Sequence, residues 1–151
     1  MKAGIDLTHV PFQGSGPEMV AMLGGQLSSA FVDATGAYPH IKSDKINILA
    51  VTGQQRHPAL PDVQTMAELG YPGFEANGWF GFFVPAATPQ AIVDKLGIEL
   101  AAIVKQPDIS KRLLEMGLIP VGSTPQEFRA VLDKDAAHWK SIVDAAQIKM
   151  D

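Results

Sequence analysis

The glycine content and the charge content of the chain both change near residue 81, and this change limits the folds that the chain can adopt. Residues 1–81 hold 11 of the 14 glycines but only 11 of the 28 charged side chains, whereas residues 82–151 hold three glycines and 17 charges. Glycine ends helices and supplies turns, so the first part predicts short strands and loops. The charged, glycine-poor second part predicts helices with one solvated face.

Five β-prone runs are separated by segments of helical character. The run at 46–52 is apolar enough to be a central, buried strand. Strands separated by helices favour βαβ units and a partly parallel sheet, so the predicted fold class is α/β. The predicted strands are residues 6–10, 27–32, 46–52, 77–84 and 118–121.

The helix signals in this sequence are local start and stop residues. Pro17 suits the first position of a helix that a Gly-Gly pair at 24–25 ends. Thr124 and Glu127 match a capping box, which predicts a helix from there to about residue 146. The other predicted helices are a turn at 37–43, a short helix at 65–69, one that Thr88 caps ahead of Pro89, and one from Pro107 to Gly117.

Composition excludes several classes of protein. The formal net charge of −4 gives no electrostatic footprint for nucleic acid or an anionic membrane surface. No apolar run approaches the ~20 residues that a membrane span needs. The absence of Cys removes disulfides, thiolate metal sites and a Cys nucleophile. Residues 1–6 lack the apolar stretch of an export signal, so none is expected in this chain.

The four histidines do not form a metal-binding pattern. None pairs with another at i, i+4, and no His-Glu-x-x-His is present, so neither a metal nor a cofactor is predicted. For His9, His40 and His138, hydrogen bonding, packing or solvation is the better explanation.

A glycine-bearing turn, Gly14-Ser15-Gly16, stands immediately before the helix at Pro17. Free backbone N–H groups at a helix start, with the helix dipole behind them, form a small anion site. The sequence does not match a P-loop, a dinucleotide fingerprint or a nucleophile elbow. The alternative, an ordinary strand-to-helix turn, stays open.

Asp33 and Thr35 follow the predicted strand at 27–32. In open α/β sheets, ligands bind outside the carboxyl ends of strands, so both side chains are placed to hydrogen-bond a ligand. A purely turn-forming Asp is the alternative. No catalytic constellation is present, so the residues by themselves indicate a small-anion-binding module that is not an enzyme.

Residues 8–17, Thr-His-Val-Pro-Phe-Gln-Gly-Ser-Gly-Pro, resemble a His-Val-Pro-Tyr-Lys-Gly-x-x-Pro segment. That segment is typical of Bug-type solute-binding receptors of tripartite tricarboxylate transporters. The similarity extends over essentially the whole chain in the same order. The further matching segments are residues 23–26, 31–33, 39–42, 49–52, 59–63, 73–76, 79–81, 85–86 and 120–122.

The resemblance implies a type II periplasmic-binding-protein fold, present here in part. Residues 1–78 resemble the later part of the second ligand-binding lobe, and residues 79–151 resemble the crossover strand and the C-terminal part of the first lobe. The resemblance also implies a periplasmic receptor that captures a small carboxylate and delivers it to a membrane permease. Two-lobed receptors run to about twice this length, so the chain is expected to be a truncated form.

The resemblance places one end of the ligand on the backbone N–H groups of the loop at 12–17, with Asp33 and Thr35 lining the cleft. Phe12 stands where the family usually has Tyr, and Gln13 where it usually has Lys. The lost hydroxyl and the lost charge predict weaker anion attraction or a different preferred ligand. The implied ligand-binding residues are Phe12, Gly14, Ser15, Gly16, Pro17, Asp33 and Thr35.

Two alternatives to a receptor stay open. A small hydrolase would use Ser15 or Asp33 with His9, although no motif supports it. A truncated product without ligand function would pair with itself through sheet edges. Self-pairing is also expected of the chain as a homodimer, with residues 79–84 or the C-terminal helices buried against a second copy. The apolar helix residues that favour it are Ile92, Leu96, Leu100, Phe128, Leu132 and Trp139.

Overall fold

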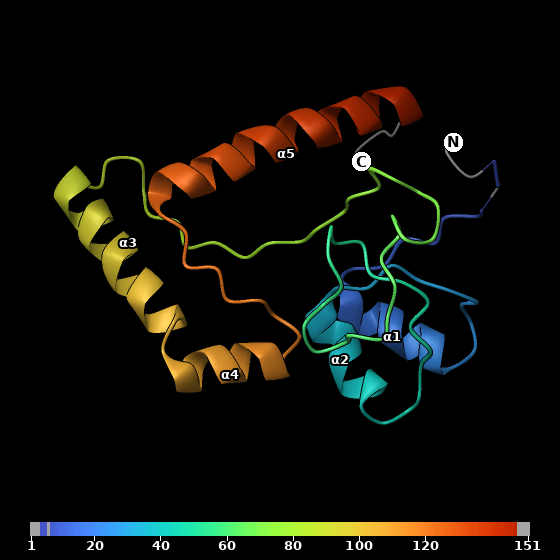
Figure 1. Cartoon of the computed structure of the whole chain (residues 1–151). Helices are drawn as coiled ribbons and strands as arrows, with labels where there is room; N and C mark the ends of the chain where they lie inside the picture. Colours follow the sequence, from blue (N-terminus) through green and yellow to red (C-terminus); the bar gives the residue numbers. More distant parts are fainter. Residues whose placement is uncertain (1–3, 6, 148–151) are drawn as a thin grey trace. The chain divides into compact units, whose positions relative to one another are not determined.

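The computed structural model describes residues 4–5 and 7–147, and the Asp6 end of the first predicted strand lies outside these residues. The described part holds five α-helices (Figure 1). They are α1 (Ser15–Leu23), α2 (Ala34–Ile41), α3 (Gln90–Val104), α4 (Pro107–Glu115) and α5 (Pro125–Ala146).

The chain divides into two compact units. Unit 1 comprises Met1–Trp79 together with Lys111–Ile119, and unit 2 comprises Phe80–Ser110 together with Pro120–Asp151. The sequence interpretation placed every residue after 78 in one segment and did not foresee the return of 111–119 to unit 1. The assignment of the chain's two parts to receptor lobes stays a prediction.

The strand predictions are wrong for the residues that the structure describes, since none of them forms a strand. One parallel β-bridge is present in that part, between Val51 and Thr65. Val51 N–H donates to the Gln64 carbonyl and Met66 N–H to the Val51 carbonyl, both at 3.0 Å. Beside this bridge, Ala76 N–H donates to the Thr52 carbonyl at 3.5 Å, which is one hydrogen bond and not the exchange of bonds that a strand requires. Apolar side chains of the extended segments stay exposed as a result.

Three helix predictions that rest on local signals are confirmed. α1 ends at the Gly-Gly pair, where Gly24 N–H donates to the Val20 carbonyl at 3.0 Å. α4 begins at Pro107, as predicted. α5 has the capping box: Thr124 Oγ1 accepts from Glu127 N–H at 3.2 Å, and Glu127 Oε2 accepts from Thr124 N–H at 2.8 Å.

Three other helix predictions need correction. α2 begins at Ala34 instead of residue 37, because Asp33 caps it. The N-cap of α3 is Pro89 without a side-chain cap; Thr88 belongs to the preceding turn, where its N–H donates to the Pro85 carbonyl at 3.0 Å. Thr65 forms the bridge to Val51, and residues 66–69 form a turn and not a helix.

The core of unit 1 is small and lies around α1 and α2, which contact each other. The Phe31 and Phe74 rings, both in unit 1, stack with their centroids 6.4 Å apart. The buried side chains of this unit are Met19, Ala21, Tyr38 and Thr65.

Unit 2 is loosely packed in the described part of the chain. Its helices α3 and α5 bury no side chain among the described residues. The core-facing stripe predicted for α3 is therefore uncovered in the described part, with Ile92 at 50% exposure. The closest packing involves Phe128 of α5: a Cβ on Gly81 would lie 2.3 Å from Phe128 Cζ, and the Phe83 ring centroid is 5.7 Å from that of Phe128.

Candidate functional site

The N-termini of α1 and α2 meet in unit 1. α1 begins at Ser15, and α2 begins at Ala34. A Cβ on Gly36 would lie 2.7 Å from Ser15 Cβ and 2.8 Å from Ser15 Oγ. Only glycine permits this approach without displacing Ser15. The first turns of both helices, each carrying a partial positive charge, are therefore held against one another.

The N-terminus of α2 is capped from within the protein. Asp33 Oδ1 accepts from Gly36 N–H at 2.9 Å and from the Thr35 hydroxyl. The hydrogen bond from the Thr35 hydroxyl holds the pKa of Asp33 below its usual range. Burial, the next largest effect, raises this pKa, and the Ser15 hydroxyl and the backbone N–H groups of Gly36 and Thr35 lower it by smaller amounts. Asp33 is thus an ionised helix cap, which is the turn-forming role left open by the sequence.

The N-terminus of α1 differs because no described side chain caps it. Its N-cap is Gly14, at φ 94° and ψ 172°. The first N–H groups of a helix have no intrahelical partner, and here they belong to residues 14–16, since Pro17 has no N–H. A Cβ on Gly14 or Gly16 would meet no atom within 4 Å, so the backbone is open on this side.

The predicted site residues fall into two groups. Thr35 is hydrogen-bonded to Asp33, and Ser15 lies against Gly36, whose N–H donates to the same carboxylate. Gly14, Gly16 and Pro17 form the exposed first turn of α1, and Phe12 precedes it as a half-buried side chain. The structure describes no hydrogen bond from His9 to Ser15 or Asp33, so it gives no support to a hydrolase.

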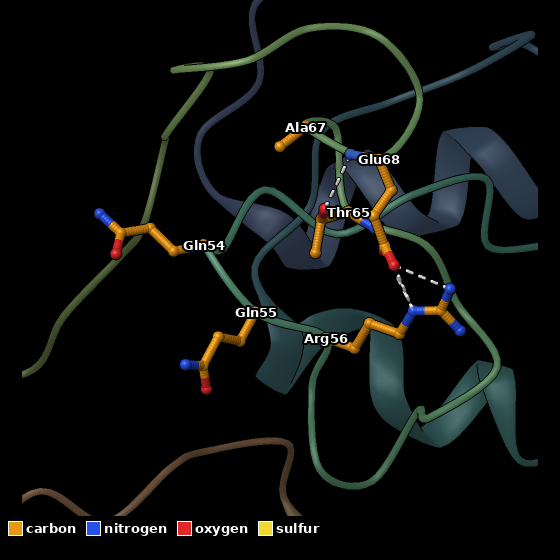
Figure 2. Close-up of a pocket in the computed structure, with 6 residues that line it drawn as sticks. All are labelled: Gln54, Gln55, Arg56, Thr65, Ala67 and Glu68. Carbon is orange, nitrogen blue, oxygen red and sulfur yellow. Dashed lines mark hydrogen bonds and ion pairs between the residues drawn. The ribbon is translucent and has the colours of Figure 1, made fainter.

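A polar depression elsewhere in unit 1 was not foreseen from the sequence. Its lining residues are Gln54, Gln55, Arg56, Thr65, Ala67 and Glu68 (Figure 2). Figure 2 shows the Gln54 and Gln55 side chains pointing away from an ion pair between Arg56 and Glu68. The pair is 12 residues apart in the chain, a separation that carries no local sequence signal.

The ion pair neutralises the charge in this depression. Arg56 Nε donates to both carboxylate oxygens of Glu68 at 3.0 Å, and Arg56 Nη1 donates to the Pro61 carbonyl at 2.9 Å. Hydrogen bonding to Arg56 first, and to Thr65 N–H second, lowers the pKa of Glu68 to about 2. Because the guanidinium already faces a carboxylate, the depression offers little attraction to another anion.

The described residues hold neither a metal-binding cluster nor a membrane-spanning helix. No group of three or more His, Asp or Glu side chains is arranged there to hold a metal ion. Among the helices of the same part of the chain, none is long and apolar enough to cross a membrane.

Comparison with known proteins identifies the chain's family. Residues 1–148 match the family described as "Tripartite tricarboxylate transporter family receptor". The chain belongs to this family. The resemblance to Bug-type receptors is confirmed, and so is the prediction that the chain is not an enzyme, since the family is one of transport receptors.

Curated relatives of the chain come from several bacteria. A protein from the clcB-clcD intergenic region of Pseudomonas knackmussii is 34% identical over 143 residues, which are 94% of this chain and 85% of that protein. Protein BugT of Bordetella pertussis is 29% identical over 150 residues, which are 99% of this chain and 46% of BugT. The chain thus spans about half the length of most relatives it matches.

Solved structures confirm the fold class as a partial type II periplasmic-binding-protein fold. An R. palustris protein solved with adipate is 31% identical, with a TM-score of 0.88 over 96% of this chain and 48% of that one. MatC from Rhodopseudomonas palustris, solved with malate, is 32% identical, with a TM-score of 0.79 over 92% of this chain and 48% of MatC. The periplasmic binding protein BugD is 31% identical, with a TM-score of 0.81 over 99% and 51%.

Proposed function

We propose that this chain contributes one side of the ligand site in a periplasmic receptor that captures a small carboxylate for a tripartite tricarboxylate transporter. The observation that carries the proposal is the meeting of two helix N-termini, of which α1 has no side-chain cap. A carboxylate complements unpartnered N–H groups at such an end. Family relatives solved with adipate and with malate supply the ligand class.

Each predicted site residue has a proposed role. The N–H groups of Gly14, Ser15 and Gly16 bind one ligand carboxylate, and Pro17 fixes the start of the helix without adding a donor. Asp33 and Thr35 act in selection, because an ionised carboxylate repels a second anion but accepts a hydrogen bond from a ligand hydroxyl.

Phe12 and Gln13 bring no charge to the loop that precedes α1. A Lys at position 13, usual in the family, would add long-range attraction for an anion. Its absence favours a site that depends on backbone donors. The permease is the proposed partner of the whole receptor, and the periplasm its proposed location.

Substitutions at Gly16 test the proposed site. Gly16→Pro removes one N–H donor from the open end of α1, so affinity for malate and adipate should fall by about tenfold or more. Gly16→Ala keeps the donor and should bind as the unchanged chain does, because a Cβ there meets no atom within 4 Å. Amide chemical shifts of an isotope-labelled chain, followed during titration with each acid, report the affinities.

The same titration can overturn the proposal. If neither acid shifts the amide signals of Ser15 and Gly16 in the unchanged chain at millimolar concentration, the site is not a carboxylate site. Equal weakening by Gly16→Pro and Gly16→Ala would assign the effect to helix distortion and not to a lost donor.

A further inference from the structure

The imidazole ring of His57 is held at both nitrogens. Ala59 N–H donates to Nδ1 at 3.2 Å, and Nε2 lies 3.2 Å from the carbonyl oxygen of Gly117. A carbonyl oxygen only accepts, so Nε2 carries the proton and donates it, while Nδ1 is the unprotonated acceptor. The half-buried ring therefore joins its own loop to a position 60 residues away.

Gly117 ends α4 in a Schellman motif. Leu118 N–H donates to the Leu113 carbonyl at 2.8 Å, and Gly117 N–H donates to the Leu114 carbonyl at 3.0 Å. Gly117 is buried and has a φ of +77°, a left-handed conformation that favours glycine. These two bonds use N–H groups and leave the Gly117 carbonyl to accept from the His57 ring.

The same glycine contacts the start of α2. A Cβ on Gly117 would lie 3.0 Å from Ala34 Cβ and 3.2 Å from the Ala34 carbonyl oxygen. Ala34 stands between Asp33 and Thr35, which form the cap of α2 and the proposed selective part of the site. All these residues belong to unit 1, so the contacts run without interruption from the His57 ring to the capped helix start.

We propose that His57 is a positioning residue for the ligand site: through its bond to Gly117 it fixes the first turn of α2, and with it the orientation of Asp33 and Thr35. The inference rests on the proposed function for its ligand consequence, but the positioning itself concerns the protein alone. The competing explanation is that His57 serves only its local turn, through Ala59.

Two substitutions separate these roles. His57→Asn keeps an acceptor for Ala59 N–H, in the manner of an Asx turn, but is too short to reach Gly117. His57→Gln keeps a donor at about the distance of Nε2 and gives up the ring acceptor for Ala59. If Gly117 is the contact that matters, the Asn variant loses the positioning and the Gln variant retains it.

Amide hydrogen exchange at Gly36 measures the positioning directly, because this N–H donates to Asp33. Loss of one hydrogen bond should lower its protection by about three- to tenfold in His57→Asn, with little change in His57→Gln. Nitrogen chemical shifts of the imidazole in the unchanged chain should show Nε2 protonated and Nδ1 unprotonated. Affinities for malate and adipate should follow the protection of Gly36.

The outcomes separate this inference from the proposed function. Unchanged protection of Gly36 in His57→Asn overturns the inference, whatever the affinities for malate and adipate are. Lowered protection of Gly36 in a chain that binds neither malate nor adipate supports the positioning role and rejects the carboxylate site. Should His57→Asn fail to fold, His57→Gln decides alone, because loss of Gly36 protection in that variant would make Ala59 the contact that matters.

Discussion

At the scale of single residues, two carboxylates are kept ionised by different partners, and only one of them belongs to the candidate site. Asp33 caps α2 and is kept ionised by hydroxyl and backbone donors. Glu68 is kept ionised by Arg56, outside the proposed site. The first carboxylate therefore bears on ligand choice, whereas the second holds a loop.

A pair of substitutions at Asp33 tests its role in selection. Asp33→Asn retains an oxygen that accepts from Gly36 N–H but removes the charge, so the affinity of adipate relative to malate should change while α2 stays intact. Asp33→Ala also removes the cap, which should destabilise the helix by about 1 kcal/mol. Titration calorimetry with both acids, beside circular dichroism, measures the two effects. The same adipate-to-malate ratio in all three proteins would leave Asp33 a helix cap alone.

The geometry of the proposed site was predictable from the sequence only where the signal is local. The Gly14-Ser15-Gly16 turn before a proline-started helix predicted the open start of α1, two residues from its true position. The approach of Gly36 to Ser15 was not predictable, because nothing in a sequence says which two helix starts meet. The bond between His57 and Gly117 crosses 60 residues and was missed for the same reason.

At the scale of elements, helices with their own start signals were found and strands were not. The Thr124–Glu127 capping box lies within one turn, so the residues that decide it are neighbours in the sequence. A β-prone run such as 77–84 indicates only that its side chains suit a pleated, half-buried surface. Whether a partner backbone lies beside it depends on residues far along the chain, and the described part supplies only the bridge at Val51.

The ion pair that stabilises the loop at residues 53–62 should depend on pH. The folded-state pKa of Glu68 is about 2, below the ordinary value of 4.5, so its ion pair stabilises the loop fully above about pH 4.5 and loses this effect as pH falls toward 2. Arg56→Ala should return the pKa of Glu68 toward 4.5. Carbon NMR of the Glu68 carboxyl, followed from pH 7 downward, measures both values.

A control for this titration lies on α4. Glu115 is paired with Lys111 at 4.0 Å, with both side chains more than half exposed. An exposed i, i+4 pair contributes little, so Lys111→Ala should leave the titration of Glu68 almost unchanged, unlike Arg56→Ala. Shifts of equal size would mean that the Arg56–Glu68 contact has no special strength.

At the scale of the whole molecule, exposed apolar surface is the dominant feature. Phe80, Phe82 and Phe83 follow one another along an extended segment and are 67–76% exposed. Burying each such side chain is worth about 1.5–3 kcal/mol, which is large against the ~5–15 kcal/mol that stabilises a folded domain. Exposed apolar surface of this kind is typical of interaction sites.

We therefore expect the chain, by itself, to form at least a dimer at micromolar concentration. Light scattering during dilution measures the mass. Phe82→Ser should weaken the association by about tenfold or more if the segment at 79–84 is the contact. Ile98→Ser, at an exposed position of α3, serves as the matched control. A monomer that melts cooperatively would contradict this expectation.

The close contact between Gly81 and Phe128 has a consequence for how this chain changes over generations. The ring fills the space that any side chain at 81 would need, so the first step from glycine forces Phe128 to swing away from Phe83. If position 128 shrinks first, a vacancy opens that a methyl group at 81 can then fill. The two positions are therefore expected to evolve as a pair and in one order. Phe128 is replaced by a smaller residue before Gly81 is replaced by a larger one.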